Sequence, residues 1–226
     1  YGMRASSGAI DSLKIHGQEL SYTTIGNEKP IGICGSGIID LLAQMRLNGW
    51  INIAGELNPE GSPRIVYLPD ENQYGAIYAY AEESANGNPL YFSQTDIDQY
   101  LDTKAAAFTM MECLQDSAGI SFEDLDHCYL SGAFPAHSDL ESAITIGIFP
   151  DLPREKYRVL RNSSLDGARK VLLNHSLLAE AKELLENIYC VQFASIPDFL
   201  VRMQAAKFIP HTDMSRFPSV QQKLSQ

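Results

Sequence analysis

A glycine-rich turn is the segment of this sequence best suited to chemistry. Gly32-Ile33-Cys34-Gly35-Ser36-Gly37 stands directly before an apolar-periodic run over residues 38–47. Glycines let the backbone turn tightly and approach a ligand, and the N–H groups at a helix start attract anions such as phosphate. Gly35, Ser36 and Gly37 are therefore candidate nucleotide-binding residues. The turn matches neither the Walker pattern nor a dinucleotide GxGxxG, so a packing turn between strand and helix stays an alternative.

The same turn contains a candidate nucleophile. A thiol near a helix N-terminus has a lowered pKa, which would suit Cys34 to a thiol hydrolase. Ser36 does not fit the GxSxG nucleophile elbow, because Cys34 and Ile38 occupy the positions of the flanking glycines. No sequence feature assigns a general base among the five histidines. A small buried cysteine is the more common role for such a residue.

Two further turns place small or polar residues between a strand and a helix. Ser131-Gly132-Ala133-Phe134-Pro135 follows the apolar run 125–130, and Asn162-Ser163-Ser164 precedes a helical pattern that contains Gly167. Open α/β sheets bind ligands at the carboxyl ends of their strands. The alternatives are ordinary strand–helix turns, with a helix cap at Asn162 or Ser163. The candidate nucleotide-binding residues from these two turns are Ser131, Gly132, Ala133, Asn162, Ser163 and Gly167.

Neither a metal site nor a catalytic residue is predicted from these patterns. His137 and Asp139 have HxD spacing, but two ligands do not make a site, and solvated loop side chains are the simpler interpretation. The four cysteines form no CxxC pair and give no zinc or iron–sulfur signature.

The elements that would position these turns follow a strand–helix rhythm. Strands are expected at 8–16, 20–26, 65–68, 76–80, 125–130, 157–160 and 188–193. Helices are expected at 38–47, from 94 to 118 with Thr95 as the N-cap, and at 139–148, 163–173, 176–186 and 197–207. Residues 51–93 read as a loop and hairpin insertion. This alternation favours an α/β layered sheet, followed by a frayed polar tail from His211 onward.

Composition excludes several classes of protein. Lys plus Arg total 17 and Asp plus Glu total 28, which gives a net charge of −11, so nucleic-acid and polybasic membrane binding are not expected. A hydrophobic fraction of 45% is enough for a real core, and no apolar run is long enough to span a membrane. We expect a cytoplasmic protein with reduced thiols. Because the chain starts at Tyr1 and enters strand-like sequence almost at once, we expect a piece of a longer protein.

The order of the motifs resembles one family. GMRASSGAI at 2–10, GICGSGIIDLL at 32–42, YLSGAF at 129–134, IGIFPD at 146–151, RNSSLDGA at 161–168 and AKFIPHTDMSRFPSV at 206–220 resemble the C-terminal ATPase region of reductive activators of corrinoid proteins. These are iron–sulfur proteins related to the actin, sugar-kinase and heat-shock-chaperone ATPases. The resemblance covers most of the chain and is weakest in 51–93.

The resemblance implies a fold, an activity and partners. The fold would be α/β, a ribonuclease-H-like lobe with a mixed sheet flanked by helices and a β-rich insertion at 50–93. Residues 1–210 would form the second lobe of an actin-like ATPase, and residues 211–226 a C-terminal tail. A whole family member uses ATP with Mg²⁺ to help return the cobalt of a corrinoid methyl-carrier protein to Co(I). Its iron–sulfur cluster would lie in an upstream domain, and the corrinoid carrier and a second copy of the chain are the expected partners.

The resemblance also assigns roles to the turns. SGAF and NSSLDGA would line the adenosine side of the cleft, and GICGSG its floor. No DIGT-like phosphate segment and no iron–sulfur cysteine pattern occur here, so the chain alone is not expected to hydrolyse ATP well or to pass electrons. The chain departs from the family pattern at Pro135 and Arg161, where glycine is usual. Either substitution would narrow the adenosine site, and Arg161 would equally suit a phosphate.

Two alternatives to this function remain beside the thiol hydrolase. The lobe could be an interaction or dimerisation module that has lost nucleotide binding, which Pro135 and Arg161 favour. It could instead belong to a related kinase or an acyl-CoA-reductase activator that uses the same fold for another acceptor.

Overall fold

Small sheets packed around one long helix organise the chain. The structure is a computed structural model that describes residues 2–225. The described strands are β1 (Ala9–His16), β2 (Glu19–Thr24), β3 (Gly32–Ile33), β4 (Ile65–Leu68), β5 (Gln73–Ala79), β6 (Leu90–Ser93), β7 (Cys128–Ser131) and β8 (Tyr157–Leu160). The α-helices are α1 (Gly35–Leu47), α2 (Gln94–Ala118), α3 (Ala133–His137), α4 (Leu140–Thr145), α5 (Ser163–Leu173), α6 (Leu177–Glu186), α7 (Phe199–Ala206) and α8 (Pro218–Leu224).

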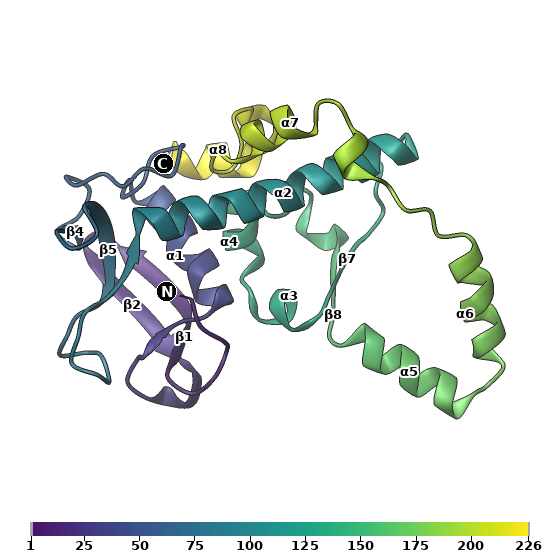
Figure 1. Ribbon diagram of the computed structural model, residues 1–226, viewed down its shortest axis with the longest axis horizontal. Coiled ribbons are helices and arrows are strands. Elements are labelled where there is room, and N and C mark those ends of the chain that lie inside the picture. The colour runs from purple at the N-terminus through teal and green to yellow at the C-terminus, as the bar shows by residue number, and fades with distance from the viewer. Residues whose placement is uncertain (1, 226) are drawn as a thin grey trace.

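The strands pair in three groups over the described residues. β1 pairs with β2 antiparallel and with β3 parallel, and β4, β5 and β6 form an antiparallel sheet within the region expected as an insertion. β7 and β8 pair in parallel, with Ser131 opposite Leu160. Helix α2 runs along the molecule between the sheets and the C-terminal helices α7 and α8 (Figure 1). The strand–helix alternation expected from the sequence is confirmed.

Two apolar clusters form the core of this arrangement. The first lies between α1 and the first two sheets, and the second lies beneath the C-terminal part of α2. The first includes Ile10, Ile39, Leu42, Met45 and Trp50, and the second includes Phe108, Leu130, Ile144, Phe217 and Val220. Burial of these side chains is the main contribution to stability.

Several element boundaries differ from expectation for identifiable reasons. Helix α2 begins after Ser93, not Thr95: the Ser93 side chain accepts from the Asp96 backbone N–H, and Asp96 accepts in return. Thr95 instead donates to Gln73. The strand expected at 188–193 is wrong, because the segment has no pairing partner and Tyr189 is 89% exposed.

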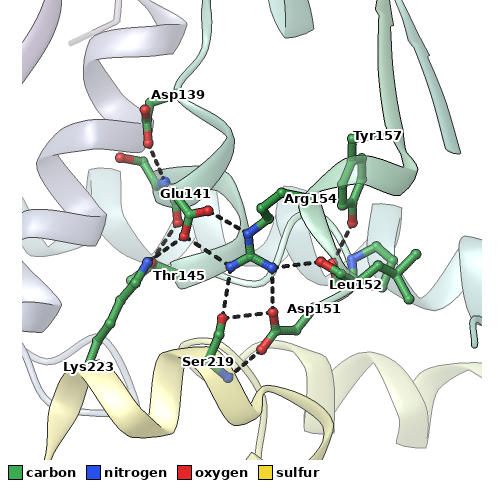
Figure 2. A network of polar contacts seen from close by, with 11 residues as sticks. Asp139, Glu141, Thr145, Asp151, Leu152, Arg154, Tyr157, Ser219 and Lys223 are labelled. Carbon is green, nitrogen blue, oxygen red and sulfur yellow. Dashed lines mark hydrogen bonds and ion pairs between the residues drawn. The ribbon is translucent and has the colours of Figure 1, made fainter.

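The C-terminal segment is part of the core rather than a frayed tail. Phe217 and Val220 are fully buried, and His211 is 5% exposed. Arg154 fixes helix α8 to the body: it donates to Glu141 of α4, to Asp151 at 2.7 Å and to Ser219 of α8 at 2.8 Å (Figure 2). The expectation of fraying is wrong because these contacts join residues far apart in the chain, which a polar local composition does not show.

Candidate functional site

The ends of β7 and β8 bring two of the predicted turns together. Because the strands are parallel neighbours, their carboxyl ends lie side by side. The Gly132 backbone N–H donates to the Arg161 carbonyl over 2.8 Å. The Ser131 and Ser163 hydroxyls are hydrogen-bonded at 2.5 Å. The parallel pairing of β7 and β8 therefore places the two motifs next to each other on one surface.

Each turn has a local reason for its shape. Gly132 has a φ of +112°, a conformation that side chains rarely adopt, and this lets the chain leave β7 and enter α3 at once. Asn162 is the N-cap of α5, since its side-chain oxygen accepts from the Leu165 N–H over 3.0 Å. The cap expected at Asn162 or Ser163 is thus at Asn162.

A hollow of about 430 Å³ opens at this junction. It is lined by Gly132, Ala136, His137, Arg161 and Asn162. Its walls offer backbone groups from a strand end, an imidazole and a guanidinium. This combination suits a ligand with an anionic part and a flat or hydroxylated part, because Arg pairs with phosphate oxygens and glycine permits close approach.

The glycine-rich turn lies beside this junction, but its residues have different surroundings. A Cβ on Gly35 would lie 3.1 Å from the Phe134 ring, which places the start of α1 next to α3. Ser36 is buried and donates to the Asp11 carbonyl at 2.8 Å. A Cβ on Gly37 would lie 2.5 Å from the Ile10 carbonyl oxygen, so Gly37 permits the close approach of α1 to β1. Ser36 and Gly37 therefore hold α1 against β1, which agrees with the alternative of a packing turn.

Gly167 differs from the other candidates in having open space where a side chain would lie. It lies on α5, where a Cβ would meet nothing within 4 Å. Ala133 begins α3 directly after Gly132. The structure thus brings Ser131, Gly132, Asn162 and Ser163 to one place, whereas Gly167 faces open space in this chain.

The two departures from the family pattern differ in position. Arg161 lines the hollow, whereas Pro135 is not among the lining residues. Pro135 is the third residue of α3, where its missing N–H has no intrahelical partner to lose. Any effect on a ligand in the hollow would therefore come from Arg161.

Sequence reasoning missed two of the lining residues. Ala136 and His137 belong to the short helix after the SGAF turn and border the hollow. The HxD spacing of His137 is typical of solvated loop side chains, and Ala136 has no distinctive chemistry. Both residues lie within six positions of the end of β7. Many helices begin at such a position, so the sequence alone does not mark these two residues as part of a site.

Cys34 is poorly placed to act as a nucleophile. It is 3% exposed, and its Sγ lies 3.4 Å from the Ser36 hydroxyl. A substrate could not reach the thiol without displacing the start of α1. The structure therefore favours the common role of a small buried side chain.

The chain has clear relatives. A family model described as the C-terminal domain of RACo, the ASKHA domain, matches residues 1–221. The chain belongs to this family. The α/β, actin-like class expected from the sequence is confirmed, and the ASKHA domain is an ATPase-like domain.

Individual relatives agree with this placement. The chain is 27% identical over 205 residues to the corrinoid activation enzyme RamQ of Eubacterium limosum, covering 88% of this chain and 35% of that protein. It is 25% identical over 209 residues to the [Co(II) methylated amine-specific corrinoid protein] reductase of Methanosarcina barkeri, covering 83% and 34%. The solved structure of a reductive activator for corrinoid, iron–sulfur protein superposes with a TM-score of 0.88 at 36% identity, covering 96% of this chain and 35% of that one. The chain spans about a third of each relative's length.

Among the described residues, no helix is long and apolar enough to cross a membrane.

Proposed function

We propose that this chain is the nucleotide-binding ASKHA domain of an ATP-dependent reductive activator of a corrinoid protein. Membership of the RACo C-terminal family and the names of the relatives support this class of function. The observation that carries the local argument is the meeting of the SGAF turn and the α5 start around one hollow. In this proposal the hollow holds the adenosine side of ATP, and the protein is cytoplasmic.

The residues of the hollow suggest how the nucleotide is held. Gly132 allows a flat ring or a ribose to lie against the backbone. Asn162 lines the hollow at the start of α5, and Arg161 offers a guanidinium that can pair with a phosphate oxygen. Ser163 follows Asn162 in the chain, and its hydroxyl is hydrogen-bonded to that of Ser131. Because ATP would bind this lobe and a second wall outside these residues, its binding would shift the closure of the two lobes. Such a shift requires different affinities for the open and closed states.

The described residues do not supply the other expected cofactors. No group of three or more His, Cys, Asp or Glu side chains in residues 2–225 is arranged to hold a metal ion. Cys34 and Cys113 are buried, Cys128 is half-buried and Cys190 is exposed, and none of the four belongs to such a group in residues 2–225. In the proposal, Mg²⁺ and the iron–sulfur cluster are therefore held by parts of the protein outside these residues.

Filling the hollow tests the nucleotide proposal. Ala136 is exposed and lines the hollow, so Ala136→Phe should block it without disturbing the core. We expect ATP affinity of the full-length protein to fall at least tenfold, measured by calorimetric titration with and without magnesium. Ala85→Phe places the same ring on an exposed position of the β-rich region and should bind ATP normally. Equal affinity of both variants, or no binding of millimolar ATP by the unmodified protein, would rule the proposal out.

The corrinoid partner is tested separately. With an electron donor, ATP and a corrinoid carrier in the Co(II) state, the full-length protein should produce the Co(I) absorption spectrum, and omission of ATP should abolish it. ATP binding without any ATP-dependent Co(I) formation on corrinoid carriers would favour a related kinase or acyl-CoA-reductase activator. Co(I) formation that survives Ala136→Phe would favour the interaction module.

A further inference from the structure

Two motifs that the nucleotide proposal does not use meet at a second cavity. The cavity has a volume of about 210 Å³, and its walls come from α2, the turn after α2, the end of IGIFPD at 146–151 and the C-terminal motif at 206–220. The lining residues with aromatic or polar side chains are Phe108, Gln115, Phe122, Glu123, Asp151 and Arg216. None of them lines the hollow at the ends of β7 and β8. A site in this cavity is therefore separate from the proposed nucleotide site.

The C-terminal wall of the cavity is fixed to α2. The ammonium of Lys104, a buried residue of α2, donates to three backbone carbonyls between residues 206 and 210. Further along α2, Glu112 pairs with Arg216 over 2.5 Å. Charge-assisted hydrogen bonds of this kind are the stronger ones in proteins. The cavity is therefore already formed without a ligand, as small-molecule sites usually are.

One wall of the cavity contains a hydrogen-bond acceptor without a donor. The Oε1 atom of Gln115 is buried and has no hydrogen-bond partner, and Gln115 lines the cavity. One turn earlier on α2, the Oε2 atom of Glu112 is likewise buried without a partner. Buried acceptors are normally satisfied, because an unpaired one lowers the stability of the fold. The cavity therefore favours a ligand that brings an N–H or O–H donor to Gln115.

The charges around the cavity favour a cation over an anion. Arg216 and Asp151 already have partners of opposite charge. Glu123 is exposed, and none of the ion pairs within residues 2–225 includes its carboxylate. Lys156 contacts Glu123 through the backbone, since its ammonium donates to the Glu123 carbonyl over 2.7 Å. A cation in the cavity therefore gains a carboxylate, whereas an anion meets one.

Two phenylalanine rings give the cavity flat apolar walls. The ring centroids of Phe108 and Phe122 lie 6.1 Å apart, with their planes at 47°. The Arg216 guanidinium carbon lies 5.3 Å from the Phe108 centroid, so one of these rings already contacts a cation. A flat ligand can pack on the same walls. Pockets for drug-sized ligands begin at about 300 Å³, so this smaller cavity suits a single ring with a short charged group.

We propose that this cavity binds a small aromatic cation whose charged group carries N–H donors, such as an amidinium or a primary ammonium. The charged group donates to Gln115 Oε1 and lies near the Glu123 carboxylate, and the ring packs against Phe108 and Phe122. The inference is independent of the nucleotide proposal, because the two sites share no lining residue. A ligand bound here contacts both α2 and the C-terminal segment, and therefore stabilises the folded protein.

Calorimetric titration of the full-length protein with three probes of similar size tests the ligand class. Benzamidine and benzylamine are cations with N–H donors at pH 7, whereas benzoate is an anion without one. We expect at least one of the two cations to bind at millimolar concentration or below, and benzoate to bind at least tenfold more weakly. If neither cation binds at millimolar concentration, water alone fills the cavity and the proposal is wrong. Equal affinity for benzoate would overturn it as well.

Two substitutions test whether the cation binds in this cavity. Gln115→Met removes the unpaired acceptor, so the affinity for the cation should fall at least tenfold while the urea midpoint of the unliganded protein rises. Gln99→Met, at an exposed position of the same helix, should change neither quantity.

Glu123→Gln tests the carboxylate at an exposed position, where the substitution does not disturb the core. The affinity for the cation should fall about threefold, as expected for the loss of an exposed charge pair. If Gln115→Met and Glu123→Gln both bind the cation as tightly as Gln99→Met, the cation binds elsewhere on the protein and the proposal is overturned.

Discussion

Gly37 shows how a single absent side chain sets the position of α1. The Ile10 carbonyl and the Ile33 side chain would lie 2.5 Å and 2.8 Å from a Cβ at this position. The glycine that the sequence suggested for ligand binding thus serves helix–strand packing. Gly35 of the same turn lies against Phe134 of α3, so the position of α1 also affects the helix that borders the hollow.

We predict opposite effects for two glycine substitutions. Gly37→Ala should lower the free energy of unfolding by about 1–3 kcal/mol, because the helix must move away from β1. Gly167→Ala, where a Cβ meets nothing, should be neutral or stabilise α5 by up to about 1 kcal/mol. Urea denaturation of both variants measures this. A Gly37→Ala protein as stable as the unmodified one would contradict the packing argument.

His211 is a buried histidine whose charge state affects stability. Its Nδ1 accepts from the Asp213 N–H at 2.9 Å, so this nitrogen carries no proton in the fold. Burial, together with the nearby Arg216 and Lys104, lowers the pKa of His211 to about 4. The unfolded chain binds this proton near pH 6.5, whereas the folded one does not.

Stability should therefore fall as the pH is lowered from 6.5 to 4. The unfolded state binds more protons in this window, and the loss due to His211 is on the order of 3 kcal/mol at pH 4. His211→Gln should flatten the pH profile in this range, although it lowers stability at neutral pH. Urea midpoints measured across the window decide this. If the free energy of unfolding of His211→Gln falls as steeply with pH as that of the unmodified protein, groups other than His211 cause the pH dependence.

At the scale of elements, the network around Arg154 joins α4 to α8 (Figure 2). Asp151, whose side chain is 2% exposed, accepts from Arg154, from the Ser219 N–H and from the Ser219 hydroxyl. Arg154 and Lys223 lower the pKa of Glu141 to about 2, against the opposing effect of partial burial. A helix of seven residues stays in place because these charges and the buried Phe217 hold it.

Removing Arg154 should release the C-terminal helix. Arg154→Met leaves the buried Asp151 carboxylate without its cation, which we expect to cost about 2–4 kcal/mol. Arg202→Met removes ion pairs to Asp116 and Asp198, which are about half exposed, and should cost less than about 1 kcal/mol. Amide exchange of residues 214–225 should rise in Arg154→Met. If these amides exchange as slowly in Arg154→Met as in the unmodified protein, the Arg154 network does not hold α8 in place.

The sequence predicted those elements whose signals are local. The Asn162 cap and the helix 163–173 were confirmed because a cap acts on residues three positions away. Ser93 and Thr95 are both good caps, and only the position of Asp96 distinguishes them. The strand at 188–193 was wrong because a strand requires a distant neighbour. Burial of Phe217 and Val220 likewise depends on α2 and not on the residues around them.

The sequence predicted the residues of the candidate site that follow the strands directly, but not those whose position depends on distant packing. The strand ends after Leu130 and Leu160 pointed to Ser131, Gly132, Asn162 and Ser163, and parallel pairing brought these together. Local patterns could not show that Ser36 and Gly37 face β1, because that depends on how closely α1 packs. Nor could they show that Ala136 and His137 border the hollow.

At the scale of the whole molecule, we propose that the chain forms one wall of a nucleotide cleft. It spans about a third of its relatives' length and directs a hollow outward at the ends of β7 and β8. In our proposal, nucleotide binds at that hollow, and the rest of the protein supplies the opposite wall.

A structure of the full-length protein with a non-hydrolysable ATP analogue tests this account most directly. The account predicts the adenosine within contact distance of Gly132, Arg161 and Asn162, with the phosphates directed toward the part of the protein outside residues 1–226. An analogue bound elsewhere, with this hollow empty or filled by protein, would contradict it.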